Sequence, residues 1–305
     1  MVPVVTIGIC VKNSESTLRE AIESVVGQDF PHYLMEIIFV DDGSEDATLS
    51  IINEYVSRID VSTKVFSTEW RGLSPARNTV VDNAAGKYIL WLDGDMILPS
   101  DNVRQQVEFM EQNPKVGIAK TRLLIKGPGK IVATLQLIPR IVDDAKSREL
   151  GMQKSKLPGT GGAIFRVEAI RQVGGFDNAL KGCGEDQDAA YRVSVAGWLL
   201  AQSPTFCCEV RNGSWKTLWN RYFWRGQGSY YLYCKNRKIF SVYKMNPIAG
   251  FMAGVLQIPA AYRLTGRKSV FLLPAYFTFI FTAWPLGFFK ASVEHDVSSL
   301  RRKPY

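Results

Sequence analysis

The chain has 305 residues, 46% of them hydrophobic, which is enough for one large domain or two small ones with a sizeable core. Its net charge of +8 is uneven, because residues 211–305 carry 15 Lys/Arg against two acids while the remainder is slightly acidic. The five cysteines show no metal-binding spacing and no signal peptide opens the chain, which argues against a secreted disulfide-bonded protein and favours reduced thiols facing the cytosol.

Apolar strands alternate with amphipathic helices over the first two thirds of the chain. Strands are predicted at 4–11, 36–40, 64–67, 88–92, 116–121 and 163–165, and helices near 18–26, 49–56, 75–84, 103–110, 168–173 and 189–196. Strands separated by helices imply right-handed crossover units and a parallel sheet. The segment from Leu123 to about Ser155 shows no readable pattern.

The basic part, 211–305, is predicted to be a separate helical region after a catalytic domain at 1–210. Between 215 and 223, aromatic and apolar residues recur on one helical face with cations beside them, which is typical of a helix lying in a lipid interface. An aromatic core helix is the alternative. Of two later apolar segments, 248–262 is short for a bilayer and 269–289 is long enough, so spanning and monotopic insertion both stay open. The aromatic content favours a membrane over nucleic acid.

Two acidic clusters follow two of the predicted strands. Asp41-Asp42 comes after 36–40, and Asp93-Gly94-Asp95 comes after 88–92. In an open α/β sheet, ligands bind outside the carboxyl ends of such strands. Carboxylates at that edge can bind a hard cation such as Mg²⁺ or Mn²⁺, and the cation can hold a diphosphate. A solvated turn is the alternative for either cluster taken alone.

Eight short motifs follow one another between residues 4 and 202. They are Val5-Thr6-Ile7-Gly8-Ile9-Cys10 with Asn13, Ser24-Val25-Val26-Gly27-Gln28, Val40-Asp41-Asp42-Gly43-Ser44, Ser74-Pro75-Ala76-Arg77-Asn78, Ala85-Gly86-Lys87-Tyr88-Ile89, Leu92-Asp93-Gly94-Asp95, Gly174-Gly175-Phe176-Asp177 and Gly184-Glu185-Asp186-Gln187-Asp188. Their order resembles a membrane-associated family 2 glycosyltransferase. The resemblance implies the GT-A fold, a Rossmann-like nucleotide-binding, mixed and mainly parallel sheet flanked by helices, followed here by a membrane-associated helical tail.

The resemblance also implies which residues bind a nucleotide sugar: Cys10, Lys12, Asn13, Asp42, Arg77, Asn78 and Asp93. Lys12 replaces an aromatic residue often found there, so it can meet phosphate while stacking on the base is lost. Asp42 would accept a hydrogen bond from the base, or form an Asx turn, or both. Arg77 would lie near the nucleotide, where a guanidinium suits phosphate, with a surface cation as the alternative.

The remaining acids have implied roles in metal binding and chemistry. Asp95 would be the direct ligand of Mg²⁺ or Mn²⁺, and Asp93 would contact the ribose or the metal's water. Asp186 would be the catalytic base that takes the proton of an acceptor hydroxyl, with direct displacement inverting the anomeric carbon. Glu185 is a weaker candidate, for an acceptor or phosphate contact. Capping of the following helix is the alternative, preferred for Asp188 with Arg192 as its partner.

The acceptor is expected to be lipid-linked. Processive members of the family carry Gln-x-x-Arg-Trp on an interfacial helix, and the run at 220–225 departs from it, which argues against long-polymer synthesis. Arg221 or Arg225 can still approach the diphosphate or a lipid phosphate. We expect a metal-dependent, hexosyltransferase-like enzyme on the cytoplasmic face of the cell membrane, acting on a polyprenyl or dolichyl phosphate or a lipid-linked glycan. A protein or soluble glycan acceptor, or a catalytically silent nucleotide-sugar-binding protein, are the alternatives.

Overall fold

The structure is a computed structural model that describes residues 2–126, 131–149, 157–180, 183–210, 213–237 and 245–294. The chain divides into two compact units. The first comprises Met1–Leu124, Gln153–Lys181 and Glu185–Val210, and the second comprises Ile125–Met152, Gly182–Gly184 and Arg211–Tyr305.

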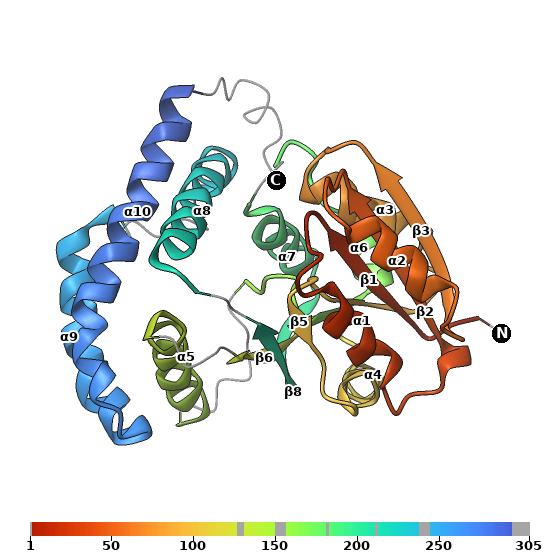
Figure 1. Cartoon of the computed structure of the whole chain (residues 1–305), viewed down its shortest axis with the longest axis horizontal. Helices are drawn as coiled ribbons and strands as arrows, with labels where there is room; N and C mark the ends of the chain where they lie inside the picture. The colour runs from red at the N-terminus through yellow and green to blue at the C-terminus, as the bar shows by residue number, and fades with distance from the viewer. Residues whose placement is uncertain are drawn as a thin grey trace. The chain divides into compact units, whose positions relative to one another are not determined.

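One mixed sheet forms the centre of the first unit, with the strand order β3-β2-β1-β4-β7-β6-β8-β5 among the described residues (Figure 1). The strands are β1 Val5–Val11, β2 Met35–Asp42, β3 Ser62–Thr68, β4 Tyr88–Trp91, β5 Met96–Ile97, β6 Val116–Lys126, β7 Ala163–Arg166 and β8 Leu199–Val210. β3, β2, β1 and β4 pair in parallel, as the sequence predicts. β7 pairs antiparallel with both β4 and β6, and β5 with β8, so the sheet is parallel only up to β4.

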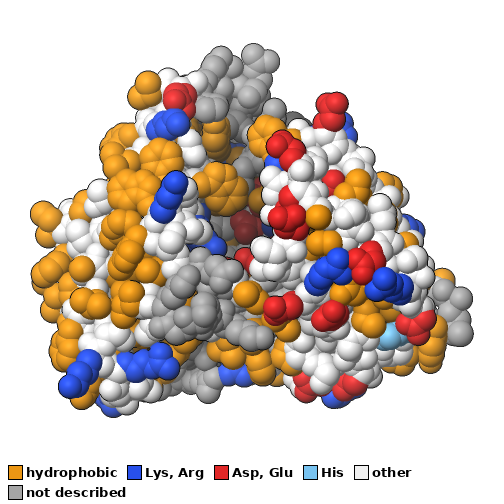
Figure 2. Space-filling model, in the orientation of Figure 1, with side chains coloured by type: hydrophobic (Ala, Val, Ile, Leu, Met, Phe, Trp, Pro, Cys, Tyr) orange, Lys and Arg blue, Asp and Glu red, His pale blue; other side chains and the backbone are white. Residues whose placement is uncertain are grey.

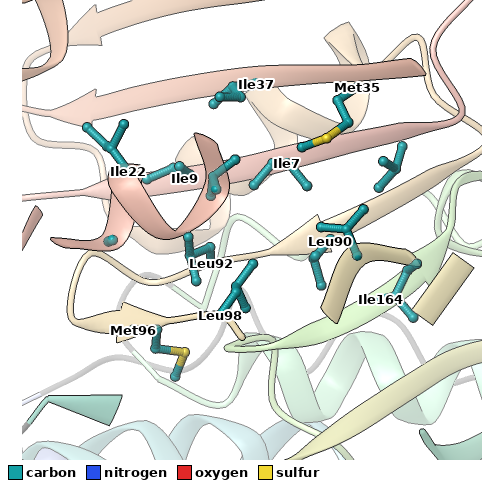
Figure 3. Packing of buried hydrophobic residues seen from close by; sticks show 14 of the residues in the cluster. Ile7, Ile9, Ile22, Met35, Ile37, Leu90, Leu92, Met96, Leu98 and Ile164 are labelled. Atoms are coloured by element: carbon teal, nitrogen blue, oxygen red, sulfur yellow. The ribbon is translucent and has the colours of Figure 1, made fainter. Parts of the chain in front are cut away.

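Helices of the first unit pack on both faces of this sheet. They are α1 Leu18–Val26, α2 Thr48–Val56, α3 Leu73–Asn83, α4 Asn102–Gln112, α6 Val167–Gln172 and α7 Glu185–Val195, with the 3-10 turn η1 His32–Leu34. Along β2, Ile37 and Phe39 join one core cluster while Ile38 and Val40 join the other. Both faces of β2 are therefore buried, which explains why residues 37–40 are continuously apolar. Figure 3 shows the first cluster, where β1, β2 and β4 meet α1.

The second unit is helical. It contains α5 Ile131–Glu149, α8 Trp215–Lys235, α9 Pro247–Thr265, the 3-10 turn η4 Lys268–Leu272 and α10 Leu273–Glu294. The predicted aromatic helix and both apolar helices are therefore present. α5 lies in the segment without a readable pattern, and it belongs to the second, helical unit. Its apolar side chains, including Leu135 and Ile138, are buried with Leu273 and Ile280 of α10.

Glycines bring α8 and α10 into backbone contact. A Cβ added at Gly226 of α8 would collide with the carbonyl oxygen of Trp284 on α10, and one added at Gly287 of α10 would collide with that of Phe223 on α8. Helices that approach through small residues are common in membranes, where apolar burial does not itself drive association. By length and composition, the described helix Lys268–Glu294 can cross a membrane, although 61% of its most apolar window is buried, as in a soluble core.

Candidate active site

Both acidic clusters lie at one edge of the sheet. Asp41 and Asp42 end β2, and Asp93 follows β4 by two residues. β1 lies between these two strands and pairs with both in parallel, with its Val11 opposite Asp41. Parallel strands place their carboxyl ends together, so the two clusters flank the end of β1, as the sequence predicts.

The first cluster organises the neighbouring loop. Asp42 is 6% exposed, and its two carboxylate oxygens accept hydrogen bonds from the backbone N–H groups of Arg71 (2.7 Å) and Gly72 (2.9 Å). Asp41 is 2% exposed, and its Oδ1 has no hydrogen-bond partner among the described residues. The carboxylate of Asp42 thus anchors the loop before α3, and each of its oxygens keeps a second lone pair for a ligand.

The end of β1 carries three of the predicted nucleotide contacts. Burial raises the pKa of the Cys10 thiol to about 12, despite nearby Arg77, so this thiol is protonated at neutral pH. Asn13 has a positive φ of 50°, and its side-chain oxygen accepts a hydrogen bond from the N–H of Glu45 (2.8 Å). The Lys12 ammonium lies 5.5 Å from the centre of an indole ring, that of Trp70.

A glycine-rich segment brings the second cluster next to Asp186. A Cβ added at Gly161 would lie 2.5 Å from Oδ2 of Asp93, and one added at Gly159 would lie 2.9 Å from Oδ2 of Asp186. The two carboxylates therefore contact one short segment, although 93 residues separate them in the sequence. Glycine at both positions leaves room for the acids, which any larger residue would displace.

Other charged groups surround Asp93. Burial raises its pKa, Arg77 and Lys120 oppose that rise, and the acids Glu209 and Asp186 add to it. Lys120 also donates a hydrogen bond from Nζ to the carbonyl of Gly161, which ties this cation to the glycine-rich segment. A bound cation would offset the cost of burying the Asp93 carboxylate and its repulsion by the neighbouring acids.

Arg77 forms a buried ion pair with Glu185. Arg77 Nη1 donates to Glu185 Oε1, and the side chains are only 7% and 3% exposed, so the alternative of a surface cation is wrong. Burial raises the pKa of Glu185 to about 7, against the effect of Arg77 and aided by Asp186. Burial opposes the charge on Arg77, but Glu185, Asp93 and Asp186 outweigh it and raise the pKa of Arg77. The positive charge of Arg77 therefore interacts both with its partner Glu185 and with the neighbouring acids Asp93 and Asp186.

Asn78 is engaged by the turn after α6. Its amide nitrogen donates to the carbonyl of Phe176 (2.8 Å) and to Oδ1 of Asn178 (2.9 Å), and its oxygen accepts from the N–H of Phe176 (2.8 Å). These bonds fix the Gly175-Phe176 turn against α3. The structure therefore gives Asn78 a scaffolding role beside the predicted site.

The first turn of α7 carries the candidate base. Glu185 and Asp186 are its first two residues, where the helix dipole favours negative charge. Asp188, two residues later, forms the predicted ion pair with Arg192 at 2.9 Å and is fully buried. Arg192 also donates to the carbonyls of Val173 and Gly175, so this pair holds α7 against the preceding turn.

Arg221 and Arg225 lie on α8 of the second unit. The guanidinium carbon of Arg225 lies 5.4 Å from the centre of the Tyr222 ring. Both arginines belong to the helix whose aromatic face the sequence predicts.

Residues 6–174 match the family model described as glycosyl transferase family 2, which is more than half of the chain. The chain belongs to glycosyl transferase family 2. An uncharacterized glycosyltransferase of Haemophilus influenzae is 36% identical to it over 112 residues, 36% of this chain and 44% of that relative. The poly-beta-1,6-N-acetyl-D-glucosamine synthase of Staphylococcus epidermidis is 26% identical over 212 residues, 67% of this chain and 50% of that relative. The chain thus spans about half the length of these curated relatives.

Solved structures share the fold of this family 2 glycosyltransferase. The mannosyltransferase PcManGT from Pyrobaculum calidifontis, in complex with GDP-Man and Mn²⁺, has a TM-score of 0.68 at 18% identity, covering 97% of this chain and 89% of that one. Staphylococcus aureus TarS in complex with UDP has a TM-score of 0.53 at 16% identity, covering 96% and 92%. The GT-A fold that the sequence motifs predict is confirmed.

Three residues that lie beside the candidate site are absent from the sequence-based prediction: Trp70, Lys120 and Glu209. Lys120 and Glu209 lie within strands β6 and β8, which contain other charged or polar residues, so neither side chain stands out in the sequence. Trp70 has a stronger signal in the sequence, because it is a large aromatic residue in an otherwise polar segment between β3 and α3.

Proposed function

We propose that this family 2 glycosyltransferase is an inverting, metal-dependent enzyme that moves a sugar from a nucleotide-sugar donor to a lipid-linked acceptor. The observation that carries the proposal is the meeting of Asp93 and Asp186 at one glycine-rich segment. It supports a donor-binding acid and a candidate base in a single site. The neighbouring structures that hold GDP-Man with Mn²⁺ or UDP support a nucleotide-sugar donor.

The residues fit a divalent cation that is bound together with a diphosphate. Among the described residues, no group of three His, Cys, Asp or Glu side chains can hold a metal by itself. Mg²⁺ usually takes only one or two protein carboxylates and completes its shell with water and substrate phosphates. Asp95 and Asp93 would supply those carboxylates. When bound, the cation neutralises charge on the departing nucleoside diphosphate.

The chain's own residues then have separate roles in the transfer. Asp186 would accept the proton of an acceptor hydroxyl as that oxygen attacks the anomeric carbon, and a single displacement inverts the carbon. Arg77, which is paired with Glu185 and interacts electrostatically with Asp93, would contribute positive charge near the diphosphate. A phosphate acceptor is already anionic, so with such an acceptor Asp186 would orient the nucleophile and transfer no proton.

An exposed apolar face on α9 supports the lipid-linked acceptor. Along this helix Ile248, Phe251, Met252, Val255, Leu256 and Tyr262 are between 37% and 74% exposed. Figure 2 shows hydrophobic side chains gathered over α9 and α10. Exposed cations, Arg263, Arg267 and Lys268, follow the face, and the only acid among the described residues of 213–294 is Glu294. A large apolar face beside unopposed cations is complementary to an anionic lipid surface.

Free thiols support the cytoplasmic side of the membrane. Cys10, Cys183, Cys207, Cys208 and Cys234 are all free in the structure. Reduced cysteines are usual where glutathione and thioredoxin act. We therefore propose that the first unit works on the cytoplasmic face of the cell membrane.

A donor and acceptor screen tests the proposed function. Detergent-solubilised full-length protein is incubated with individual nucleotide sugars, Mn²⁺ or Mg²⁺, and polyprenyl phosphate or lipid-linked glycan extracts. We expect nucleoside diphosphate to be released only when metal and a lipid acceptor are both present. If only soluble glycans or proteins become glycosylated, the lipid-linked half of the proposal is wrong.

Changing Leu256 to glutamate is expected to weaken binding to vesicles of phosphatidylcholine and phosphatidylglycerol. Leu256 is 74% exposed, so the fold should tolerate the change. Burying one leucine side chain in lipid contributes about 1.5–3 kcal/mol, so its loss should lower partitioning into the vesicles by about 10- to 100-fold. Co-sedimentation measures it, with Tyr33→Glu as the control, because Tyr33 is 61% exposed in the first unit. Equal binding by Leu256→Glu and the wild type would contradict a membrane contact through α9.

A further inference from the structure

Trp70 is an exposed indole at the edge of the sheet that carries the acidic clusters. It lies in the loop between β3 and α3, and 61% of its surface is accessible. The Lys12 ammonium, just past the end of β1, lies 5.5 Å from the ring centre. The backbone next to this exposed ring is nevertheless held in place by hydrogen bonds to Asp42.

Two contacts fix the loop that carries Trp70. The Asp42 carboxylate accepts hydrogen bonds from the next two backbone N–H groups, those of Arg71 and Gly72. Gly43 has a positive φ of 74°, and a Cβ added there would lie 2.7 Å from the backbone nitrogen of Trp70. The end of β2 therefore packs directly on this backbone, which presents the indole in a preorganised position.

The position of the ring suits a nucleobase. β1, β2 and β3 run parallel, and ligands of open α/β sheets bind outside the carboxyl ends of such strands. The resemblance implies an aromatic residue at the position of Lys12, and this chain has a lysine there. A ring that contacts one cation and is still mostly exposed offers a face to a planar ligand. Lys12 would orient the ring through a cation–π contact of about 0.5–1 kcal/mol.

We propose that Trp70 is the stacking surface for the base of the donor nucleotide. This inference rests on the proposed function, since it assumes a nucleoside diphosphate donor. Stacking of a base on an aromatic side chain contributes about 1–3 kcal/mol, and any base has a suitable face. Trp70 therefore adds affinity for the nucleoside, while the acids at the end of β4 bind the diphosphate end.

Comparing ligands with and without a base tests this role. Calorimetric titrations use the full-length protein with Mn²⁺ and with UDP, GDP or inorganic pyrophosphate. Trp70→Ala is expected to raise the Kd of whichever nucleoside diphosphate the wild type binds by about 10- to 100-fold, and to leave the Kd of pyrophosphate unchanged. Trp70→Phe should lose only a few-fold. Tyr33→Ala, which removes an equally exposed aromatic residue from η1, should change neither.

The outcomes separate this inference from the proposed function. If Trp70→Ala binds the nucleoside diphosphate as tightly as the wild type, or weakens pyrophosphate equally, Trp70 is not the stacking surface. In both cases the proposed function stands, because the wild type still binds the nucleotide. If the wild type binds neither UDP nor GDP in the presence of Mn²⁺, the donor assignment itself fails.

Discussion

Changing Asp95 to alanine is expected to lower kcat/KM for sugar transfer by about 10²–10³-fold. Asp95 is the proposed direct ligand of the cation, and loss of one group that stabilises developing charge commonly reduces the rate by about 10²–10³-fold. The local backbone conformation should be retained. The carbonyl of Asp95 accepts a hydrogen bond from the N–H of Val210 (2.7 Å), and alanine can form the same bond. Turnover is measured as released nucleoside diphosphate.

Measuring nucleotide binding with and without Mn²⁺ distinguishes loss of metal binding from other effects of the substitution. Asp95→Ala is expected to abolish the enhancement of binding by Mn²⁺. Asp186→Asn should keep that enhancement while the transfer rate to a hydroxyl acceptor falls by about 10²–10⁴-fold. The matched control is Asp82→Ala, at an exposed carboxylate near the end of α3, which should behave as the wild type. Full activity in both Asp95→Ala and Asp186→Asn would remove these acids from the active site.

Features that depend on local sequence could be predicted well. β2 and β4 are buried on both faces, so their residues form apolar runs, and the acids come where these two strands end. Asp42 and Asp93 were located at the sheet edge by this pattern alone. The hydrogen bonds of Asp42 could not be predicted in the same way, because they go to a loop 29 and 30 residues away.

Features that depend on distant partners were missed. α5 buries its apolar side chains against helices more than 100 residues later, so its own sequence does not reveal which face is covered. β8 contains Pro204 and polar residues, which argue against a strand when read alone. The meeting of Asp186 with Asp93, and of Glu185 with Arg77, likewise follows from tertiary packing of α7 and of the glycine-rich segment.

Changing Arg77 to methionine is expected to destabilise the first unit by about 3–5 kcal/mol at pH 8. Removing one partner of a buried ion pair leaves the other charge uncompensated, and here Glu185 is 3% exposed. Glu185 Oε2 already has no hydrogen-bond partner among the described residues. Urea unfolding measures the loss, and Arg19→Met is the control, because the Arg19–Glu54 pair is exposed and should contribute less than about 1 kcal/mol.

The loss in Arg77→Met is expected to shrink as the pH falls from 8 towards 5.5. In the wild type the pKa of Glu185 is raised from the usual 4.5 to about 7, so its contribution to stability declines as pH rises across that interval. Arg77 lowers the pKa values of both Glu185 and Asp93, and without it each carboxyl should hold its proton to a higher pH. The variant therefore loses most stability at high pH, where Glu185 and Asp93 must ionise next to Asp186 without a compensating cation.

The double variant Arg77→Met/Glu185→Gln should recover part of the stability at pH 8. A loss of stability that does not vary with pH would show that packing, and not charge, holds Arg77 in place.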